Sequence, residues 1–264
     1  MSTHLYCVLP HQMRGAGAIP PGLSGVDGCR VRELAVDRLV AWVSDIAREI
    51  PAPSLTPKLA EAPLWFDGLQ EHDAVVEAAL GTGTTPVPAR FGQRFLDDDA
   101  CRAALVSRAA SVESLLDTMQ GFVEMTVIIT PSTRRMLRDL EPVIPEILAP
   151  RKRGTKSRHV ETLRSGEAAT HAIADATDDL AERIRVATAD VVRRSTVHGS
   201  VTPMPLRTIS HLVARDDIAR YKDAIGAVPS GREFRFLVIG PRAPYSFCGL
   251  NEESGGKHGM NLAE

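Results

Sequence analysis

The stretch "LRTISHLVARDDIARYKDAIGAVPSGREFRFLVI", Leu206–Ile239, decides the fold predicted for the second half of this chain. "LRTISHLVAR" and "REFRFLVI" have the alternating apolar residues of β-strands. Between them, "DDIARYKDAIGAV" begins with aspartates that suit a helix N-cap. Its apolar residues recur at helical spacing, so the residues predicted to face inward are Ile218, Tyr221, Ile225 and Val228. The stretch therefore predicts a strand, a short helix and a second strand.

The residues before this stretch extend the pattern. "GFVEMTVIIT", Gly121–Thr130, and "TVHGSVTPMP", Thr196–Pro205, are predicted strands. A long helix is predicted from Glu167 to Arg194, because apolar residues recur there every three or four positions. Its inward-facing stripe is predicted to contain Ala169, Ile173, Ala176, Leu180, Ile184, Ala187 and Val191. The resulting order of strand, helix, strand, strand, helix, strand is the split βαβ pattern of a ferredoxin-like fold.

The first half of the chain predicts another unit of strands and helices. "HLYCVLP", "CRVRELAV" and "LVAWVSDI" are predicted strands, and the last two form a hairpin through Asp37 and Arg38. "GLQEHDAVVEAAL" predicts a helix that ends at Gly81 and Gly83, while the prolines of "TPVPARFGQRF" suit an edge strand. One amphipathic helix is predicted over Asp97–Met119, with an inward face of Cys101, Leu105, Val112, Leu115, Leu116 and Met119.

The fold class predicted from these patterns is α/β (α+β) with two domains, residues 1–120 and residues 121–264. A short helix is expected from Ser132 onward. The basic segment at residues 150–159, "PRKRGTKSRH", has no apolar periodicity and is predicted to be a solvated surface loop.

Composition sets limits on the class of protein. The chain has 264 residues, of which 44% are apolar, and a formal net charge of -2, which provides no global field for nucleic acid or an anionic membrane. Its four cysteines are far apart in the sequence, without the C-x-x-C spacing of zinc or iron–sulfur sites. No segment reaches the length of a spanning helix, and the N-terminus lacks the basic region of a signal peptide. A soluble, cytoplasmic protein without a membrane partner is expected.

Motifs that would indicate catalysis or a cofactor are missing from the sequence. "GAGAIPPG" and "GTGTTP" run into prolines where a nucleotide-binding turn would begin a helix. Ser44, Ser210 and Ser246 lie outside a G-x-S-x-G elbow, and the histidines do not pair as metal ligands do. We therefore expect no enzyme activity, no cofactor and no metal. An enzyme whose site is assembled in space stays open as an alternative.

A ferredoxin-like sheet also permits RNA binding through exposed aromatic residues. Phe234 and Phe236 alternate on the last predicted strand beside arginines, which is a faint version of such a surface. The strand departs from the RNP1 pattern, and core phenylalanines are the favoured interpretation. RNA binding is therefore the second hypothesis, and no nucleic-acid partner is expected.

Two segments are not explained by composition: "PVPARFGQRFLDDD", Pro86–Asp99, and "GPRAPYSF", Gly240–Phe247. Both resemble signatures of the gas vesicle protein F/L family, which are typically "lPvRFGtvf" and "tGPwPPYsF". Arg242 and Ala243 stand where the family often has tryptophan and proline. The matching positions are Pro88, Arg90, Phe91, Gly92 and Phe95 in the first segment, and Gly240, Pro241, Pro244, Tyr245, Ser246 and Phe247 in the second.

The resemblance implies a protein with two domains, each a variant of the ferredoxin-like fold, that acts without catalysis. It implies an accessory or minor structural component of gas vesicle formation, located at the gas vesicle and in the cytoplasm. The implied partners are the small, very hydrophobic major shell protein and other gas vesicle accessory proteins. A soluble partner that covers the apolar surface and sheet edges of an unassembled shell monomer would oppose its aggregation.

The segment "GPRAPYSF" is expected to be a structural corner, with partner binding as the alternative. Gly240 would leave the last strand with unusual torsion angles, and Pro241 and Pro244 would fix the backbone that follows. Tyr245 and Phe247 would then pack together between the domains, where the tyrosine hydroxyl would find a hydrogen-bond partner.

Overall fold

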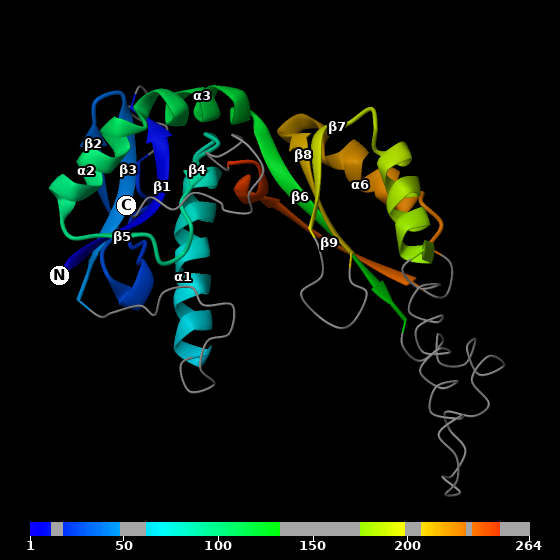
Figure 1. The fold of residues 1–264 in the computed structure, drawn as a ribbon, viewed down its shortest axis with the longest axis horizontal. Helices are drawn as coiled ribbons and strands as arrows, with labels where there is room; N and C mark the ends of the chain where they lie inside the picture. Colours follow the sequence, from blue (N-terminus) through cyan, green and yellow to red (C-terminus); the bar gives the residue numbers. More distant parts are fainter. Residues whose placement is uncertain (12–17, 48–61, 133–174, 199–206, 231–233, 249–264) are drawn as a thin grey trace, which may run out of the picture. The chain divides into compact units, whose positions relative to one another are not determined.

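The computed structural model describes residues 1–11, 18–47, 62–132, 175–198, 207–230 and 234–248. It is a mixed α/β structure with two antiparallel sheets (Figure 1). The elements are β1 (Ser2–Pro10), η1 (Val26–Gly28), β2 (Arg32–Val36), β3 (Leu39–Ile46), α1 (Ala62–Gly81), β4 (Val87–Pro88), β5 (Arg94–Phe95), α2 (Asp98–Ser107), α3 (Ala109–Met119), β6 (Phe122–Pro131), β7 (Val192–His198), β8 (Arg207–Ala214), η2 (Arg215–Asp217), α6 (Ile218–Gly226), β9 (Phe234–Arg242) and η3 (Tyr245–Phe247). Residues 175–187, before β7, are also helical.

The chain divides into two compact units. Unit 1 consists of Met1–Glu124 together with Pro241–Glu264, and unit 2 is Met125–Gly240. The division near residue 124 lies close to the boundary predicted at 120/121. In contrast to the prediction of two continuous domains, the chain from Pro241 on belongs to unit 1.

The sheet of unit 1 has the strand order β2-β3-β1-β4, and β5 also pairs with β1. The predicted hairpin is confirmed, because β2 and β3 pair from Arg32↔Val43 to Val36↔Leu39. Asp37, in the turn, has a φ of 50°, a left-handed conformation that aspartate tolerates. The predicted edge segment also holds, since the short strand β4 ends the order.

Helices cover both faces of this sheet. Successive side chains of a strand point to opposite faces, and β1 shows the result directly. The hydroxyl of Thr3 donates to Asp98 of α2 at 2.8 Å, whereas the next side chain, His4, contacts His72 of α1 at 3.0 Å. Strand β1 is therefore the centre of the unit 1 core, and every residue from Thr3 to Leu9 is buried.

The prediction of a single helix over Asp97–Met119 is wrong, because the chain forms two helices there, α2 and α3. Arg108 interrupts them with a φ of −119° and a ψ of 12°, and its amide donates to the carbonyl of Leu105 at 3.1 Å. The predicted inward face survives the break, since the residues buried on the two helices are Cys101, Leu105, Val112, Leu116 and Met119.

The sheet of unit 2 has the order β7-β8-β6-β9. With strands numbered along the unit, this is 2-3-1-4, which is compatible with the predicted ferredoxin-like arrangement. The sheet of unit 1 repeats the same order. Helix α6 buries Tyr221 and Ile225 as predicted, Val228 is buried just after the helix, and Ile218 is only partly buried. The Tyr221 hydroxyl lies 2.8 Å from Nδ1 of the buried His211 on β8.

The long helix differs from its prediction in its end and in its face. Its helical residues stop at 187, and β7 begins at Val192, inside the range predicted as helix. Ala176 and Ala187 are exposed. The residues buried along it are Thr177, Leu180 and Ile184, and Thr188 is buried directly after its end. The predicted helix from Ser132 and the basic loop at residues 150–159 lie outside the described residues. None of the described helices has the length and hydropathy that crossing a membrane requires.

The N-cap of α2 gives a testable prediction. Asp97 accepts a hydrogen bond from the amide of Ala100 at 2.8 Å, so Asp97→Ala should destabilise unit 1 by about 1 kcal/mol. Asp99→Ala is the matched control, because the contact of Asp99 within the described residues is an exposed ion pair with Arg102, which is worth about 0.5 kcal/mol or less. Urea unfolding monitored by circular dichroism measures both. Equal effects of the two substitutions would contradict the cap.

Candidate functional site

The two signature segments pack onto one helix, α1, in unit 1. Phe91 of the first segment and Ala243 of the second belong to the same buried cluster as Val75, Val76 and Ala79 of α1. Tyr245 packs against this cluster. Segments that are far apart in the sequence therefore share one core, and of the predicted site residues Phe91 and Tyr245 contribute to it.

The first segment runs beside β1 and turns sharply. Pro88, in β4, pairs with Cys7. Gly92 has a φ of 87°, which glycine adopts without strain, and the amide of Gln93 closes the turn on the Arg90 carbonyl at 3.0 Å. Phe91 is buried by this turn, whereas the Arg90 side chain is exposed and stands outside the shared core.

Gly68 of α1 makes the room that Phe91 needs. A Cβ atom at this position would lie 2.9 Å from Cζ of the phenylalanine ring. Real Cβ atoms do not approach a neighbour so closely. A glycine inside a helix weakens it by roughly 0.5–1 kcal/mol relative to alanine, and here the absence of a side chain lets the first segment approach α1.

A buried histidine pair ties the first segment to α1 and β1. Nε2 of His72 lies 3.1 Å from the carbonyl oxygen of Ala89. Because a carbonyl only accepts, this nitrogen carries the proton, and Nδ1 accepts from Nε2 of His4 at 3.0 Å. Burial lowers the pKa of His72 to about 4. Burial, followed by the nearby His72 and Arg94, lowers the pKa of His4 to about 3. Both rings are therefore neutral at neutral pH.

The second segment is attached to α1 through a carboxylate. The Tyr245 hydroxyl donates to Oδ1 of Asp73 at 3.0 Å, and the Arg242 guanidinium pairs with the other oxygen, Oδ2. Glu77, one turn further along α1, lies 3.6 Å from Nε of Arg242. Burial and then the charge of Asp73 raise the pKa of Tyr245 well above its usual range, so the phenol remains a donor.

The backbone of the second segment has the predicted special conformation. Gly240 has a φ of 130°, and Pro244 precedes the short turn η3, which the Phe247 amide closes on the Pro244 carbonyl at 3.0 Å. The Ser246 amide and hydroxyl donate to the two carboxylate oxygens of Glu124 at 2.8 and 2.7 Å. Phe247 is buried and Pro241 is exposed.

Two expectations about this corner can now be compared with the structure. The expected hydrogen-bond partner of Tyr245 exists and is Asp73. The expected packing between the domains is replaced by contacts within unit 1, since Asp73, Glu77 and Glu124 all belong to that unit. The arrangement is a clamp that fixes the closing segment to α1 and to the start of β6.

Sequence reasoning missed the residues that complete this clamp. Asp73 and Glu77 are four residues apart, a spacing that puts both acids on one helix face and could have indicated a cationic partner. The His4–His72 contact joins residues 68 positions apart and left no local signal. Arg242, a departure from the family signature, became the partner of Asp73. Within the described part of the chain, no cluster of three or more His, Cys, Asp or Glu residues could hold a metal ion.

The clamp predicts unequal effects of two aromatic substitutions. Phe247→Ala removes a buried ring and should lower the free energy of unfolding by about 3–5 kcal/mol. Tyr245→Phe keeps the ring and removes one hydrogen bond to a carboxylate, which should lower it by about 1.5–3 kcal/mol. Thermal denaturation measures both. A Phe247→Ala protein with unchanged stability would show that the corner does not hold the fold.

The histidine pair predicts that stability depends on pH. In the folded state both pKa values lie below the ordinary 6.5, so the unfolded chain binds more protons on acidification. The contribution of the neutral histidine pair to the free energy of unfolding should be fully present above pH 6.5 and should decrease as the pH falls toward 4. His72→Gln, which keeps a donor near Ala89 but does not titrate, should flatten this decrease. Melting temperatures across the range test the effect, and an unchanged slope in the variant would contradict it.

Comparison with known proteins finds one matching family and similar curated proteins. The family described as gas vesicle synthesis protein GvpL/GvpF matches residues 2–249. The chain is 25% identical to gas vesicle protein L of Streptomyces sp. (strain CB03234) over 246 residues, covering 90% of each chain. It is 29% identical to gas vesicle protein F of the same organism over 268 residues, covering 94% of this chain and 99% of the other.

Solved structures show the same fold. The crystal structure of the gas vesicle protein GvpF from Anabaena sp. PCC7120 aligns with a TM-score of 0.70 at 17% identity, covering 97% of this chain and 98% of that one. GvpF from Microcystis aeruginosa aligns with a TM-score of 0.66, also at 17% identity, covering 94% and 98%. The resemblance based on Pro86–Asp99 and Gly240–Phe247 is thereby confirmed. This chain belongs to the gas vesicle synthesis protein GvpL/GvpF family.

Proposed function

We propose that this protein acts without catalysis as an accessory or minor structural component of gas vesicle formation, and that it binds the hydrophobic major shell protein before or during assembly. Membership of the family supports the role in gas vesicle formation and an association with the gas vesicle. The binding partner is the further step of the proposal. It also includes contacts with other gas vesicle accessory proteins.

The observation that carries this proposal is the apolar edge of the second sheet. Strand β9 ends the order β7-β8-β6-β9, so among the described strands it pairs only with β6. Its run Phe236–Ile239 is apolar, and Leu237 is 55% exposed. An exposed apolar edge strand attracts another strand, and proteins normally protect such edges. A shell monomer that has not yet assembled is a suitable partner for β9, because adding one of its strands beside β9 would also cover the apolar edge of the shell monomer.

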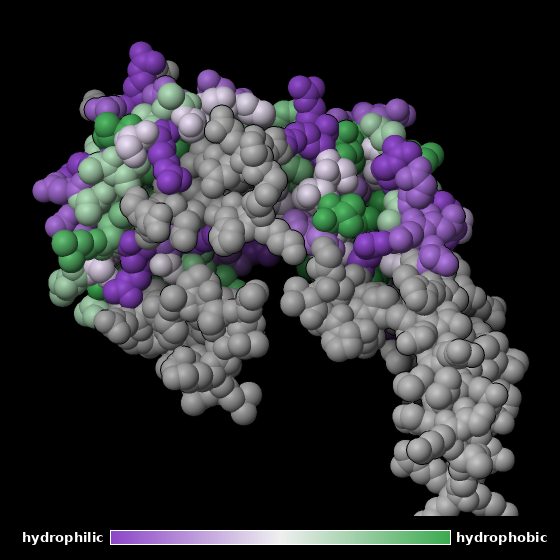
Figure 2. Space-filling model, in the orientation of Figure 1, coloured by the Kyte–Doolittle hydropathy of each residue, from purple (hydrophilic) through white to green (hydrophobic). Residues whose placement is uncertain are grey.

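The visible surface favours an edge over a broad hydrophobic face. On the side shown in Figure 2, hydrophobic residues of the described chain occur singly or in small groups among hydrophilic ones. A large partner therefore finds no extended apolar patch on the described part of this face. Backbone pairing along an edge supplies affinity without such a patch.

The RNA-binding hypothesis gains less support. Phe234 is only 8% exposed, which leaves its ring unable to stack on a base. Phe236 is half-buried, and the chain carries a formal net charge of -2. Core packing of these phenylalanines was the favoured interpretation, and for Phe234 it is confirmed. An enzyme site assembled in space is not favoured by any contact of the described residues, and the proposal keeps the protein non-enzymatic.

Co-expression with the major shell protein tests the proposal. The wild-type chain should increase the soluble fraction of the shell protein and elute with it. Leu237→Lys places a charge on the apolar edge and should reduce the co-eluting fraction severalfold without unfolding the chain, because the side chain is exposed. Val186→Lys is the matched control, since Val186 is 61% exposed on the helix of the same unit.

Two outcomes would contradict the proposal at different levels. A shell protein that stays insoluble and never elutes with the wild-type chain rules out direct binding. If the wild-type chain binds and Leu237→Lys and Val186→Lys weaken binding equally, direct binding of the shell protein stands, but the β9 edge is not its site.

A further inference from the structure

The edges of the two sheets differ in how well they are protected against a further strand. Among the described strands, those at an edge are β2, β4 and β5 in unit 1, and β7 and β9 in unit 2. Strands β4 and β5 have only two residues each. Strand β7 carries the exposed side chains of Arg193 and Arg194. Short edge strands and charged side chains both discourage the addition of another strand.

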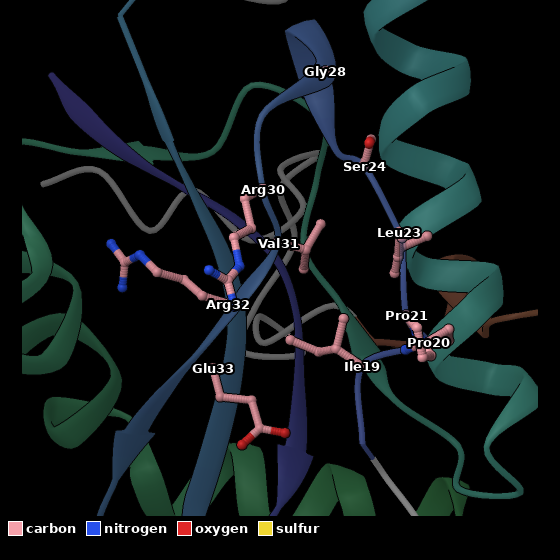
Figure 3. Close-up of a pocket in the computed structure, with 11 residues that line it drawn as sticks. Ile19, Pro20, Pro21, Leu23, Ser24, Gly28, Arg30, Val31, Arg32 and Glu33 are labelled. Carbon is pink, nitrogen blue, oxygen red and sulfur yellow. The ribbon is translucent and has the colours of Figure 1, made fainter.

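The edge beside β2 is partly occupied by the chain itself. Figure 3 shows residues 19–24 on one side of a groove and residues 30–33, which lead into β2, on the other. Ser24 pairs with Arg30 in an isolated antiparallel bridge. Arg32 forms ion pairs with two aspartates of the same unit. Both the backbone and the charge at this edge therefore already have partners within unit 1.

Strand β9 presents backbone groups along its apolar run. The hydroxyl of Thr130 on β6 donates to the Arg235 carbonyl at 3.4 Å, so the backbone groups of Arg235 point toward β6. The N–H and C=O of one residue lie on the same side of a strand, and the side alternates from residue to residue. The backbone groups of Phe236 and Val238 therefore point away from β6, toward the edge.

Arg235 places a positive charge beside this run. Phe234 is buried whereas Arg235 and Leu237 are exposed, as the alternation of side chains along a strand requires. No carboxylate of the described residues forms an ion pair with Arg235. The acidic residue of the neighbouring strand β6, Glu124, accepts hydrogen bonds from Ser246 instead. The guanidinium of Arg235 can therefore meet a carboxylate on an added strand.

We propose that β9 selects its partner strand by an acidic residue that pairs with Arg235. The inference rests on the proposed function, because the strand in question belongs to the shell protein. That strand would run antiparallel to β9, with apolar side chains opposite Leu237 and Ile239 and a carboxylate opposite Arg235, at the next position on the same face. A second copy of β9 fits less well, because Phe234–Arg242 contains no acidic residue.

The probe is a labelled peptide with two valines and then a glutamate at alternate positions, separated by threonines. It is titrated against the full chain by fluorescence anisotropy at low salt, beside a peptide with lysine in place of the glutamate. The wild-type chain should bind the glutamate peptide more tightly, in the high micromolar range. Arg235→Glu should weaken this binding about fivefold and strengthen binding of the lysine peptide, because the attraction and the repulsion exchange places.

The matched control is Arg193→Glu. It makes the same charge change on β7, at the other edge of the same sheet, and should alter the binding of neither peptide. This control separates a contact with Arg235 from an effect of the net charge of the chain.

The backbone supplies a second readout. When the glutamate peptide is bound, amide hydrogen exchange should slow at Phe236 and Val238, whose N–H groups point to the edge. The amides of Leu237 and Ile239 point toward β6 and should change less. Slowing at every other residue distinguishes strand addition from contacts of side chains alone.

Four results would overturn the proposal. Neither peptide binds, or Arg235→Glu and Arg193→Glu have equal effects. Arg235→Gln binds the glutamate peptide more tightly than the wild-type chain does, which would show that Arg235 protects the edge. Alternatively, the chain alone forms a dimer that Leu237→Lys abolishes, so that β9 pairs with a second copy.

Co-expression with the shell protein separates this proposal from the proposed function. Capture that depends on Leu237 and is unchanged in Arg235→Glu would leave the proposed function standing and overturn the selection of an acid. Discrimination between the two peptides without capture of the shell protein would support the selection at Arg235 and contradict the shell protein as the partner.

Discussion

One turn of α1 holds together parts of unit 1 that are distant in the sequence. His72 donates to the Ala89 carbonyl of the first signature segment, and its neighbour Asp73 accepts from Tyr245 of the second. Both contacts are buried or partly buried, where an unpaired polar group is expensive. The two segments therefore depend on the same helix being in place, and the helix in turn depends on Gly68 to let Phe91 approach.

The opposite face of the same sheet is fixed by charges rather than by rings. Arg32 on β2 bridges Asp45 on β3 and Asp98 at the start of α2. Thr3 of β1 donates to the same aspartate. Asp98 thus connects the edge strand β2 and the central strand β1 to the start of α2.

Local patterns predicted most of the strands and helices, but not the break at Arg108, the end of the long helix or the contacts between elements. The hairpin at Asp37 and three of the four residues predicted to face inward around α6, Tyr221, Ile225 and Val228, were predictable, because each depends on residues close in the sequence. Arg108 gave no signal of the break between α2 and α3. Thr177 and Thr188 were not predicted as core residues, since threonine is polar. Thr188, directly after the last helical residue, is buried with its hydroxyl satisfied, because it donates to the Ile184 carbonyl at 2.8 Å. Of the site, the unusual conformation of Gly240 was predicted from the sequence, whereas that of Gly92 was not, and the acceptors Asp73, Ala89 and Glu124 depend on the tertiary fold.

The discontinuity of unit 1 has a consequence for biosynthesis. Unit 2 is continuous from Met125 to Gly240, so a ribosome delivers it in full before the residues from Pro241 on have been made. During that interval the nascent chain carries α1 with Asp73 and Glu77 unmatched by Arg242 and Tyr245, and β6 with Glu124 unmatched by Ser246. Domains generally fold as units during synthesis. Unit 1 is therefore the first unit to be synthesised in part and the last to be complete. It can complete its contacts only after translation has passed the end of β9.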